Sequence, residues 1–226
     1  MHNQQVPEDK YYHVYNRGVE KRDVFLNNSD YHRFLYLLFA CNDTAQLLNS
    51  QFHYRGPTSI VNKERDQLVD IICFCLMPNH YHLILKPRKE NGMPLFMQKI
   101  GTGYTMYFNT KRQRSGVLFQ GGYKSILIDN EGYLSHLTRY IHLNPAELIE
   151  PKWKKVGILK AKETHKFVKE YKWSSYRDYL NTPHFPHLLN VELIKELFLP
   201  KQEYESFVHE WLVDNINLLG RYTLED

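Results

Sequence analysis

The sequence predicts an α+β fold in which a ferredoxin-like sheet, built in the order β-α-β-β-α-β, is followed by an added helix bearing Tyr140 and by a helical C-terminal extension. Two observations carry this prediction. Four segments with strand character alternate with helical patterns in that order along residues 11–144. Only Pro78-Asn79 separates the two middle strands, which predicts a hairpin.

The first strand is predicted at residues 11–16, YYHVYN, because they are mostly aromatic or β-branched and are followed by a turn signal. The next helix starts at a polar cap, Ser29 or Asp30. Apolar residues then recur at helical spacing; they are Phe34, Leu37, Leu38 and Cys41. Residues 43–67 are polar and weakly patterned, which predicts an irregular insertion.

The hairpin is predicted from residues 68–77 and 80–87. The first of these segments, LVDIICFCLM, is almost continuously apolar, which is typical of a strand buried on both faces. It contains Cys73 and Cys75. With only three cysteines in the chain, a disulfide framework is not expected, and we interpret these two as buried free thiols.

A longer helix is predicted from Met93-Pro94 to about Thr110, since proline is favoured in the first turn of a helix. Gly101 and Gly103 lie inside it. Each glycine lowers helix stability by roughly 1 kcal/mol relative to alanine. Their presence indicates that another group packs closely against this helix.

The fourth strand is predicted at residues 123–128, YKSILI, and Asp129 or Asn130 can cap the helix that runs through Tyr140. Pro145 helps to end that helix. Residues 1–150 therefore form one domain. Residues 151–226 form the extension, which contains KWSSYRDYL and the amphipathic segments VELIKELF and QEYESFVHEWL.

Composition bounds the class of protein. Apolar content of 42% with 24% charged residues is ordinary for a soluble globular protein, and no apolar run approaches the ~20 residues that span a bilayer. The N-terminus lacks the pattern of a secretory signal, so a cytoplasmic location without a membrane partner is expected. The net charge of +4 is compatible with a polyanionic partner.

The segment MPNHYHLIL, residues 77–85, holds two histidines that would project to the same side of a strand. His80 and His82 are then close enough for both imidazoles to bind one cation. The spacing alone is weak support, because chance supplies about 0.6 such pairs in a chain with this histidine content. Asn144 is a candidate third ligand, since it lies one helical turn after Tyr140. Two imidazoles and an amide oxygen suit Mg²⁺ or Mn²⁺ better than a structural zinc.

Several segments together resemble a known family. MPNHYHLIL resembles the HUH motif (histidine, bulky apolar residue, histidine) of the single-tyrosine transposases, and RYIHLNP, residues 139–145, resembles their tyrosine-bearing segment. YHVYNRG with DVF, YTMYFN, GVLFQGGYKS and WSSYRDYL follow the same pattern over roughly residues 11–180. The closest resemblance is to the REP-associated tyrosine transposases.

This resemblance implies metal-dependent cleavage and transfer of single-stranded DNA through a 5′-phosphotyrosine, usually at a DNA hairpin, by a transposase or a domesticated derivative. Residues 1–150 would be the catalytic domain. His80 and His82 match the metal ligands, Tyr140 matches the nucleophile, and Asn144 falls where a further polar ligand lies. The implied cofactor is a divalent ion, Mg²⁺ or Mn²⁺. A monomer and a homodimer, in which Tyr140 acts in the partner's site, both stay open.

Basic residues follow several predicted elements and are the expected contacts to DNA phosphates, with aromatic side chains nearby for base stacking. They are Arg17, Lys21, Arg22, Lys111, Arg112, Arg114 and Lys124.

Two other functions are compatible with the residues. A nucleic-acid-binding module without catalysis can use this sheet, although such modules present aromatic side chains where this chain has His80 and His82. A metal-dependent phosphodiester hydrolase can use the histidines with water. His13 is interpreted as structural, and no role is assigned to His136 or His142.

Overall fold

The computed structural model describes residues 7, 9–45, 65–180, 182, 184–190, 192, 193, 196 and 201–213. Most of the predicted insertion at residues 43–67 and most of the segment VELIKELF lie outside the described residues. None of the helices in the described part of the chain is both long and apolar enough to cross a membrane.

The centre of the molecule is a four-stranded antiparallel sheet with the spatial order β2-β3-β1-β4. The strands are β1 (Tyr11–Arg17), β2 (Val69–Met77), β3 (His80–Pro87) and β4 (Lys124–Ile128). This is the ferredoxin-like order. The predicted fold class and the predicted hairpin turn at Pro78-Asn79 are therefore confirmed.

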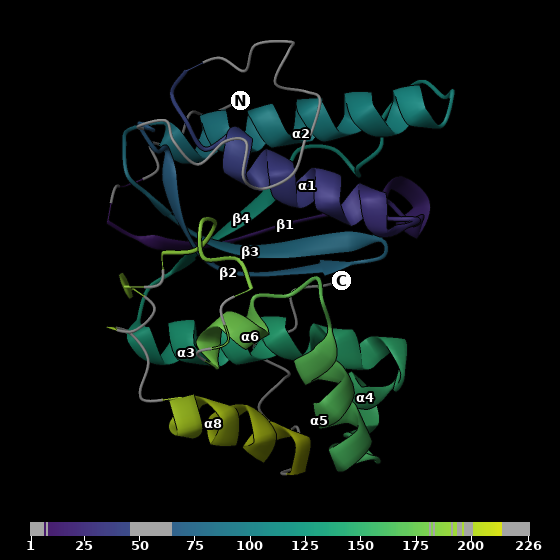
Figure 1. Cartoon of the computed structure of the whole chain (residues 1–226), viewed down its shortest axis with the longest axis vertical. Helices are drawn as coiled ribbons and strands as arrows, with labels where there is room; N and C mark the ends of the chain where they lie inside the picture. The colour runs from purple at the N-terminus through teal and green to yellow at the C-terminus, as the bar shows by residue number, and fades with distance from the viewer. Residues whose placement is uncertain are drawn as a thin grey trace.

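One face of the sheet is covered by α1 (Asn28–Ala40) and α2 (Gly92–Lys111), as Figure 1 shows. The prediction that Ser29 or Asp30 is the N-cap of α1 is wrong, because the cap is Asn27. Asp30 instead lies inside the first turn. Its Oδ2 accepts hydrogen bonds from the backbone amides of Leu26, at 3.0 Å, and Asn27, at 3.2 Å.

The opposite face is covered by α3 (Glu131–Leu143) and by the extension (Figure 1). Asn130 is the N-cap of α3, as predicted, and its Oδ1 accepts a hydrogen bond from the amide of Tyr133 at 2.7 Å. The helices of the extension are α4 (Trp153–Val156), α5 (Ala161–Glu170), α6 (Tyr176–Tyr179) and α8 (Lys201–Val213). Short 3₁₀ segments η1 (Val19–Lys21) and η4 (Asn144–Leu148) follow β1 and α3.

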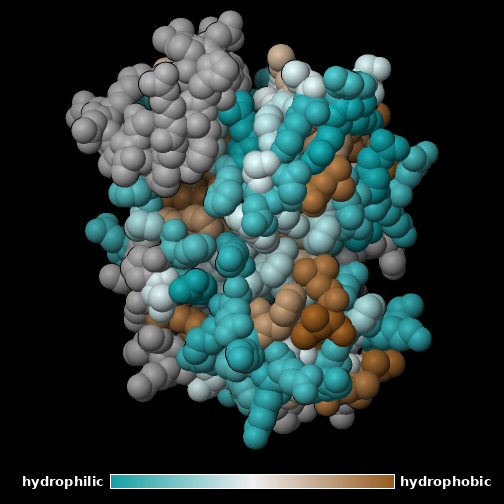
Figure 2. Space-filling model, turned by 45° about the vertical axis from the view of Figure 1, so that its right-hand side comes forward, coloured by the Kyte–Doolittle hydropathy of each residue, from teal (hydrophilic) through white to brown (hydrophobic). Residues whose placement is uncertain are grey.

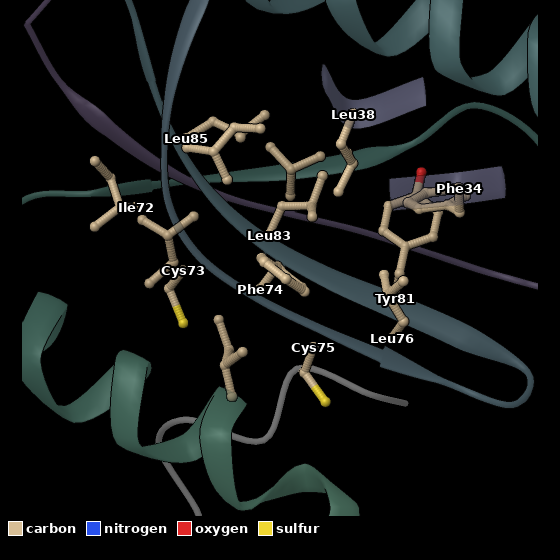
Figure 3. Packing of buried hydrophobic residues seen from close by; sticks show 14 of the residues in the cluster. Phe34, Leu38, Ile72, Cys73, Phe74, Cys75, Leu76, Tyr81, Leu83 and Leu85 are labelled. Atoms are coloured by element: carbon tan, nitrogen blue, oxygen red, sulfur yellow. The ribbon is translucent and has the colours of Figure 1, made fainter. Parts of the chain in front are cut away.

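The core lies on both sides of β2 and β3. Leu83 of β3 faces the same side as Phe34 and Leu38 of α1, whereas the sulfur atoms of Cys73 and Cys75 point to the other side (Figure 3). Both cysteines are fully buried free thiols, which confirms the prediction. Burial raises the pKa of the Cys73 thiol.

The extension bonds directly to the outer edge of β2. The amide of Leu76 donates to the carbonyl of Trp173 at 2.9 Å, and the amide of Ser175 donates to the carbonyl of Phe74 at 3.0 Å. Farther along, the hydroxyl of Tyr179 donates to the carbonyl of Ile72. Residues 173–175 therefore satisfy backbone groups that an edge strand would otherwise expose to water.

Candidate active site

The two histidines of β3 project to the face of the sheet that α3 covers. The His80 and His82 rings are 5.0 Å apart between centroids and nearly perpendicular. In the register of the sheet, His82 lies opposite Tyr15 and His80 opposite Arg17, so all four residues share this face. The alternation read from the sequence therefore brings the imidazoles together.

Each imidazole is oriented by a neighbouring side chain. Nδ1 of His80 lies 2.5 Å from Oδ1 of Asn79, and Nδ1 of His82 lies 2.9 Å from Nε2 of His13. A neutral imidazole that donates through Nδ1 carries its lone pair on Nε2, and metal-binding histidines commonly have such a partner. The contact with His13 can therefore position His82 as a candidate ligand.

Tyr140 lies on α3 against this pair. Its ring is 6.1 Å from that of His82 in an edge arrangement, and the side chain is buried. Asn144 is the first residue of η4, and its αR backbone continues the turn of α3. Nδ2 of Asn144 donates to the carbonyl of Tyr140 at 3.2 Å, so both side chains leave the same end of the helix.

A lysine from the extension completes this end of the site. Nζ of Lys154 donates to Oδ1 of Asn144 at 3.2 Å, lies 3.2 Å from Oε2 of Glu147, and stands 5.2 Å from the centre of the Tyr140 ring. The sequence did not single out Lys154, because its position depends on how α4 packs against the end of α3. Its ammonium places a positive charge beside the tyrosine.

The donor chemistry fits a divalent ion that accepts nitrogen and oxygen ligands. His80 and His82 supply imidazole nitrogens from one strand face, and Asn144 supplies an amide oxygen. Within the described ranges, no three His, Cys, Asp or Glu side chains gather into a group able to hold a metal ion. An ion bound here would therefore depend on the asparagine and on oxygen atoms of the substrate or of water.

The candidate site is closed to solvent. His80, His82, Tyr140 and Asn144 are each less than 5% exposed. A phosphodiester can reach the tyrosine hydroxyl only after a neighbouring side chain moves, and the partly exposed Lys154 is next to it.

Two of the predicted phosphate contacts lie beside the histidines. Arg17 is opposite His80 in the sheet. Lys124, at the start of β4, is exposed, and its Nζ stands 5.7 Å from the centre of the Tyr15 ring on the same face. Both positive charges therefore flank the candidate site.

Two other predicted contacts pair with a buried carboxylate. Lys111 and Arg112 bind the buried carboxylate of Asp30 at 2.5 and 3.0 Å. Burial alone would raise the pKa of Asp30, but hydrogen bonds from Lys111, the Leu26 amide and Tyr107 outweigh it, and the pKa is lowered. These cations neutralise a charge inside the protein.

The remaining predicted contacts are Arg114, which follows α2, and Lys21 and Arg22, which follow β1. Arg114 donates to Oδ1 of Asn109 at 2.6 Å and to the carbonyl of Val117 at 3.1 Å. Arg22 pairs with Glu20 at 2.9 Å. Lys21 is exposed.

His142, to which no role was assigned, links the tyrosine helix to the extension. Its Nδ1 lies 2.7 Å from the hydroxyl of Tyr204, and its Nε2 lies 2.8 Å from Oγ of Ser175 and 3.3 Å from Sγ of Cys73. Burial lowers the pKa of His142 to about 3, so the ring is neutral near pH 7. The sequence signal for a buried His142 is its position between two apolar residues, Ile141 and Leu143, in a buried helix.

Comparison with known proteins identifies the family. Residues 11–144 match the family described as Transposase IS200 like. The chain belongs to this family. The matched region contains His80, His82 and Tyr140 and ends at Asn144, whereas Lys154 lies outside it.

A solved structure shares the fold of this IS200-like transposase family member. It is that of a REP-associated tyrosine transposase bound to a REP hairpin, with a TM-score of 0.53, 13% sequence identity, and coverage of 83% of this chain and 88% of that chain. A comparison with curated proteins finds no match. Family membership supports a transposase function with DNA as the partner.

Proposed function

We propose that this protein cleaves and rejoins single-stranded DNA, beside a hairpin, through a covalent link between DNA and Tyr140. The observation that carries the proposal is the contact between Tyr140 and His82, whose rings are 6.1 Å apart although they come from α3 and β3. A buried tyrosine next to two imidazoles provides groups that a tyrosine transesterification uses, the phenol as nucleophile and the imidazoles as ligands for a metal ion.

In the proposed reaction, the phenolic oxygen of Tyr140 attacks the phosphorus of a phosphodiester. The bond from phosphorus to the 3′ oxygen breaks, a 5′-phosphotyrosine forms, and the proton released by the tyrosine is balanced by protonation of the departing 3′ oxygen. Attack by a second 3′-hydroxyl on the phosphotyrosine reverses these changes and joins the strands. One phosphodiester replaces another, so no external energy source is needed.

The residues of the chain have distinct parts in this reaction. His80, His82 and Asn144 would hold a divalent ion, which when bound neutralises charge on the phosphoryl oxygens. His13 and Asn79 keep the two rings oriented. Arg17 and Lys124 would bind phosphates on either side of the cleaved bond.

The test is the formation of a covalent adduct. A hairpin with a single-stranded flank, labelled at its 3′ end, is incubated with the protein and Mg²⁺ or Mn²⁺, and the mixture is resolved under denaturing conditions. We expect the label to travel with the protein and a 5′-labelled substrate to release a fragment ending in a 3′-hydroxyl. Tyr140→Phe should abolish the adduct, whereas Tyr133→Phe, on the same helix, should retain it.

Other outcomes separate the alternatives. Cleavage without an adduct, unchanged in Tyr140→Phe, would identify a metal-dependent hydrolase that uses water. Tight DNA binding with no cleavage under any divalent ion would identify a binding module.

A further inference from the structure

A groove of about 580 Å³ lies on the face of the sheet opposite the histidines. We name it the α2 groove. One wall is the middle of α2, the other is the loop at residues 117–123, and Asn16 and Tyr81 of the sheet lie at its base. Its volume falls within the range of ~300–1,000 Å³ typical of small-molecule sites.

The helix wall presents mainly polar side chains to the groove. Gln98, Gly101, Thr102 and Thr105 share one face of α2 and line the groove, whereas Ile100 and Tyr104 of the same helix are buried in the core. A polar face with a glycine at its centre is a poor choice for packing within the protein. It leaves amide and hydroxyl groups along the wall.

The two helix glycines are explained differently. A Cβ at Gly103 would lie 3.4 Å from Leu37, so contact between α1 and α2 accounts for a small residue there. A Cβ at Gly101 would meet nothing within 4 Å, and the same holds for Gly122 on the opposite wall. Packing inside the described chain therefore accounts for one helix glycine and leaves Gly101 facing open space.

The residues that line the groove determine which class of ligand can bind in it. None of the described residues that line the groove carries a charge, which disfavours a phosphate or a carboxylate inside it. Tyr123 and the apolar side chains of Met97 and Phe119 can stack against a flat ring, and Gln98 with the threonines can bind polar atoms at its edge. Val117 and Met106 line the same groove and are 68% and 64% exposed, so a bound ring would cover apolar surface.

The surroundings favour a nucleic acid as the source of that ring. Arg114 is held at the carbonyl of Val117, so a cation stands at one wall of the groove. On the face drawn in Figure 2, apolar side chains form separate patches among hydrophilic ones and no continuous apolar area.

The groove is also fixed to the end of the sheet where His80 lies. The amide of Gln120 donates to the carbonyl of Arg17 at 2.9 Å, and Nδ2 of Asn16 donates to the carbonyl of Gly121 at 3.1 Å. Because Arg17 is opposite His80 in the sheet, Arg17 connects the loop wall of the groove to the candidate active site.

We propose that the α2 groove binds one unpaired nucleobase of the DNA substrate. This inference rests on the proposed function only in taking DNA as the substrate. The nucleobase stacks against Tyr123, Met97 and Phe119, its polar edge faces Gln98 and the threonines of α2, and its flanking phosphates remain outside near Arg114.

The test fills the groove without disturbing the fold. Gly101→Leu adds a side chain where a Cβ meets no atom, and leucine is a better helix former than glycine, so the melting temperature should not fall. Thr110→Leu adds the same side chain at an exposed position on α2 that does not line the groove. The probe is a hairpin with single-stranded flanks that carries the fluorescent base 2-aminopurine at each unpaired position in turn.

We expect one position to change its fluorescence on binding to the wild type and to Thr110→Leu, and to show no change with Gly101→Leu. Affinity for the flanked hairpin should fall at least about fivefold in Gly101→Leu, because a stacked base is lost. Wild-type fluorescence and affinity in Gly101→Leu would overturn the proposal. A base signal without any tyrosine adduct would uphold the groove and refute the proposed reaction, and an adduct without any base signal would do the reverse.

Discussion

At the residue scale, the candidate site combines side chains that are far apart in the sequence, so the sequence does not show directly that they are in contact. The direction of His80 and His82 follows from the two-residue repeat of a strand, and the shared end of Tyr140 and Asn144 follows from the helical repeat. The position of Lys154 follows from neither repeat. Among these side chains, Lys154 has the most direct consequence for metal binding.

Lys154 and a divalent ion would compete for one atom. The ammonium already binds Oδ1 of Asn144 at 3.2 Å, and two cations close to one carbonyl oxygen repel each other. We expect Lys154→Met to bind Mn²⁺ several-fold more tightly, measured by the loss of the free-ion signal in electron paramagnetic resonance. Lys155→Met, an exposed neighbour, is the control. Equal or weaker Mn²⁺ binding in Lys154→Met would show that the ammonium does not oppose the ion.

The predicted DNA contacts should separate into two classes. Lys124→Ala is expected to weaken binding of hairpin DNA and to reduce the slope of log affinity against log salt by about 0.7 to 0.9, with an unchanged melting temperature. Arg112→Ala is expected to lower the free energy of unfolding by about 1–2 kcal/mol, because it leaves the buried Asp30 with one cation fewer. Titrations at several salt concentrations and urea denaturation measure the two effects. A salt slope unaffected by Lys124→Ala would remove that residue from the interface.

The sequence could not make this separation. Lys111 and Arg112 look like any exposed basic cluster after a helix, and Asp30 is distant in the chain. Only the packing of α1 on α2 brings the carboxylate to them. His13 is similar, since its contact with His82 depends on the pairing of β1 with β3.

At the scale of elements, α3 is held at its C-terminal end by a buried polar cluster. His142 lies two residues after Tyr140 and contacts Tyr204, Ser175 and Cys73. Strand and helix spans were predictable because each shows a pattern of apolar residues, a helical repeat in α1 and a nearly continuous apolar run in β2. The contact of residues 173–175 with β2 was not, since three residues are too few to show a repeat.

The buried ring of His142 should make stability depend on pH. Its folded pKa of about 3 lies below the usual value of 6.5, so the unfolded chain binds the proton more readily. The stabilisation is complete above about pH 6.5 and is lost as pH falls toward 3, by up to about 1.4 kcal/mol per pH unit. We expect urea denaturation between pH 7 and 4 to show a shallower pH dependence for His142→Gln than for the wild type. Parallel curves would show that His142 is solvated.

At the scale of the whole molecule, one chain contains every group of the candidate site. The Tyr140 ring lies against His82 of the same chain, and the extension closes the same end through Lys154. The match to the IS200-like family ends at Asn144, so Lys154 of the extension lies outside it.

Because Tyr140 and the histidines meet within one chain, a mixture of two inactive variants should stay inactive. Tyr140→Phe and His82→Ala, each unable to form the DNA adduct, are combined and assayed with labelled hairpin DNA. We expect no adduct. An adduct carried by the His82→Ala chain would show that Tyr140 works in a partner's site, and mass labels on the two chains identify the carrier.

The bonds from residues 173–175 to β2 also bear on self-association. An unpaired strand edge is a template on which another copy of the chain can add a strand. With the outer edge of β2 engaged by Trp173 and Ser175, the edge that remains is β4, which is five residues long and begins with Lys124. Short, charged edges resist strand addition. Removing the extension would therefore expose the outer edge of β2, which has nine largely apolar residues, and we expect the shortened chain to aggregate.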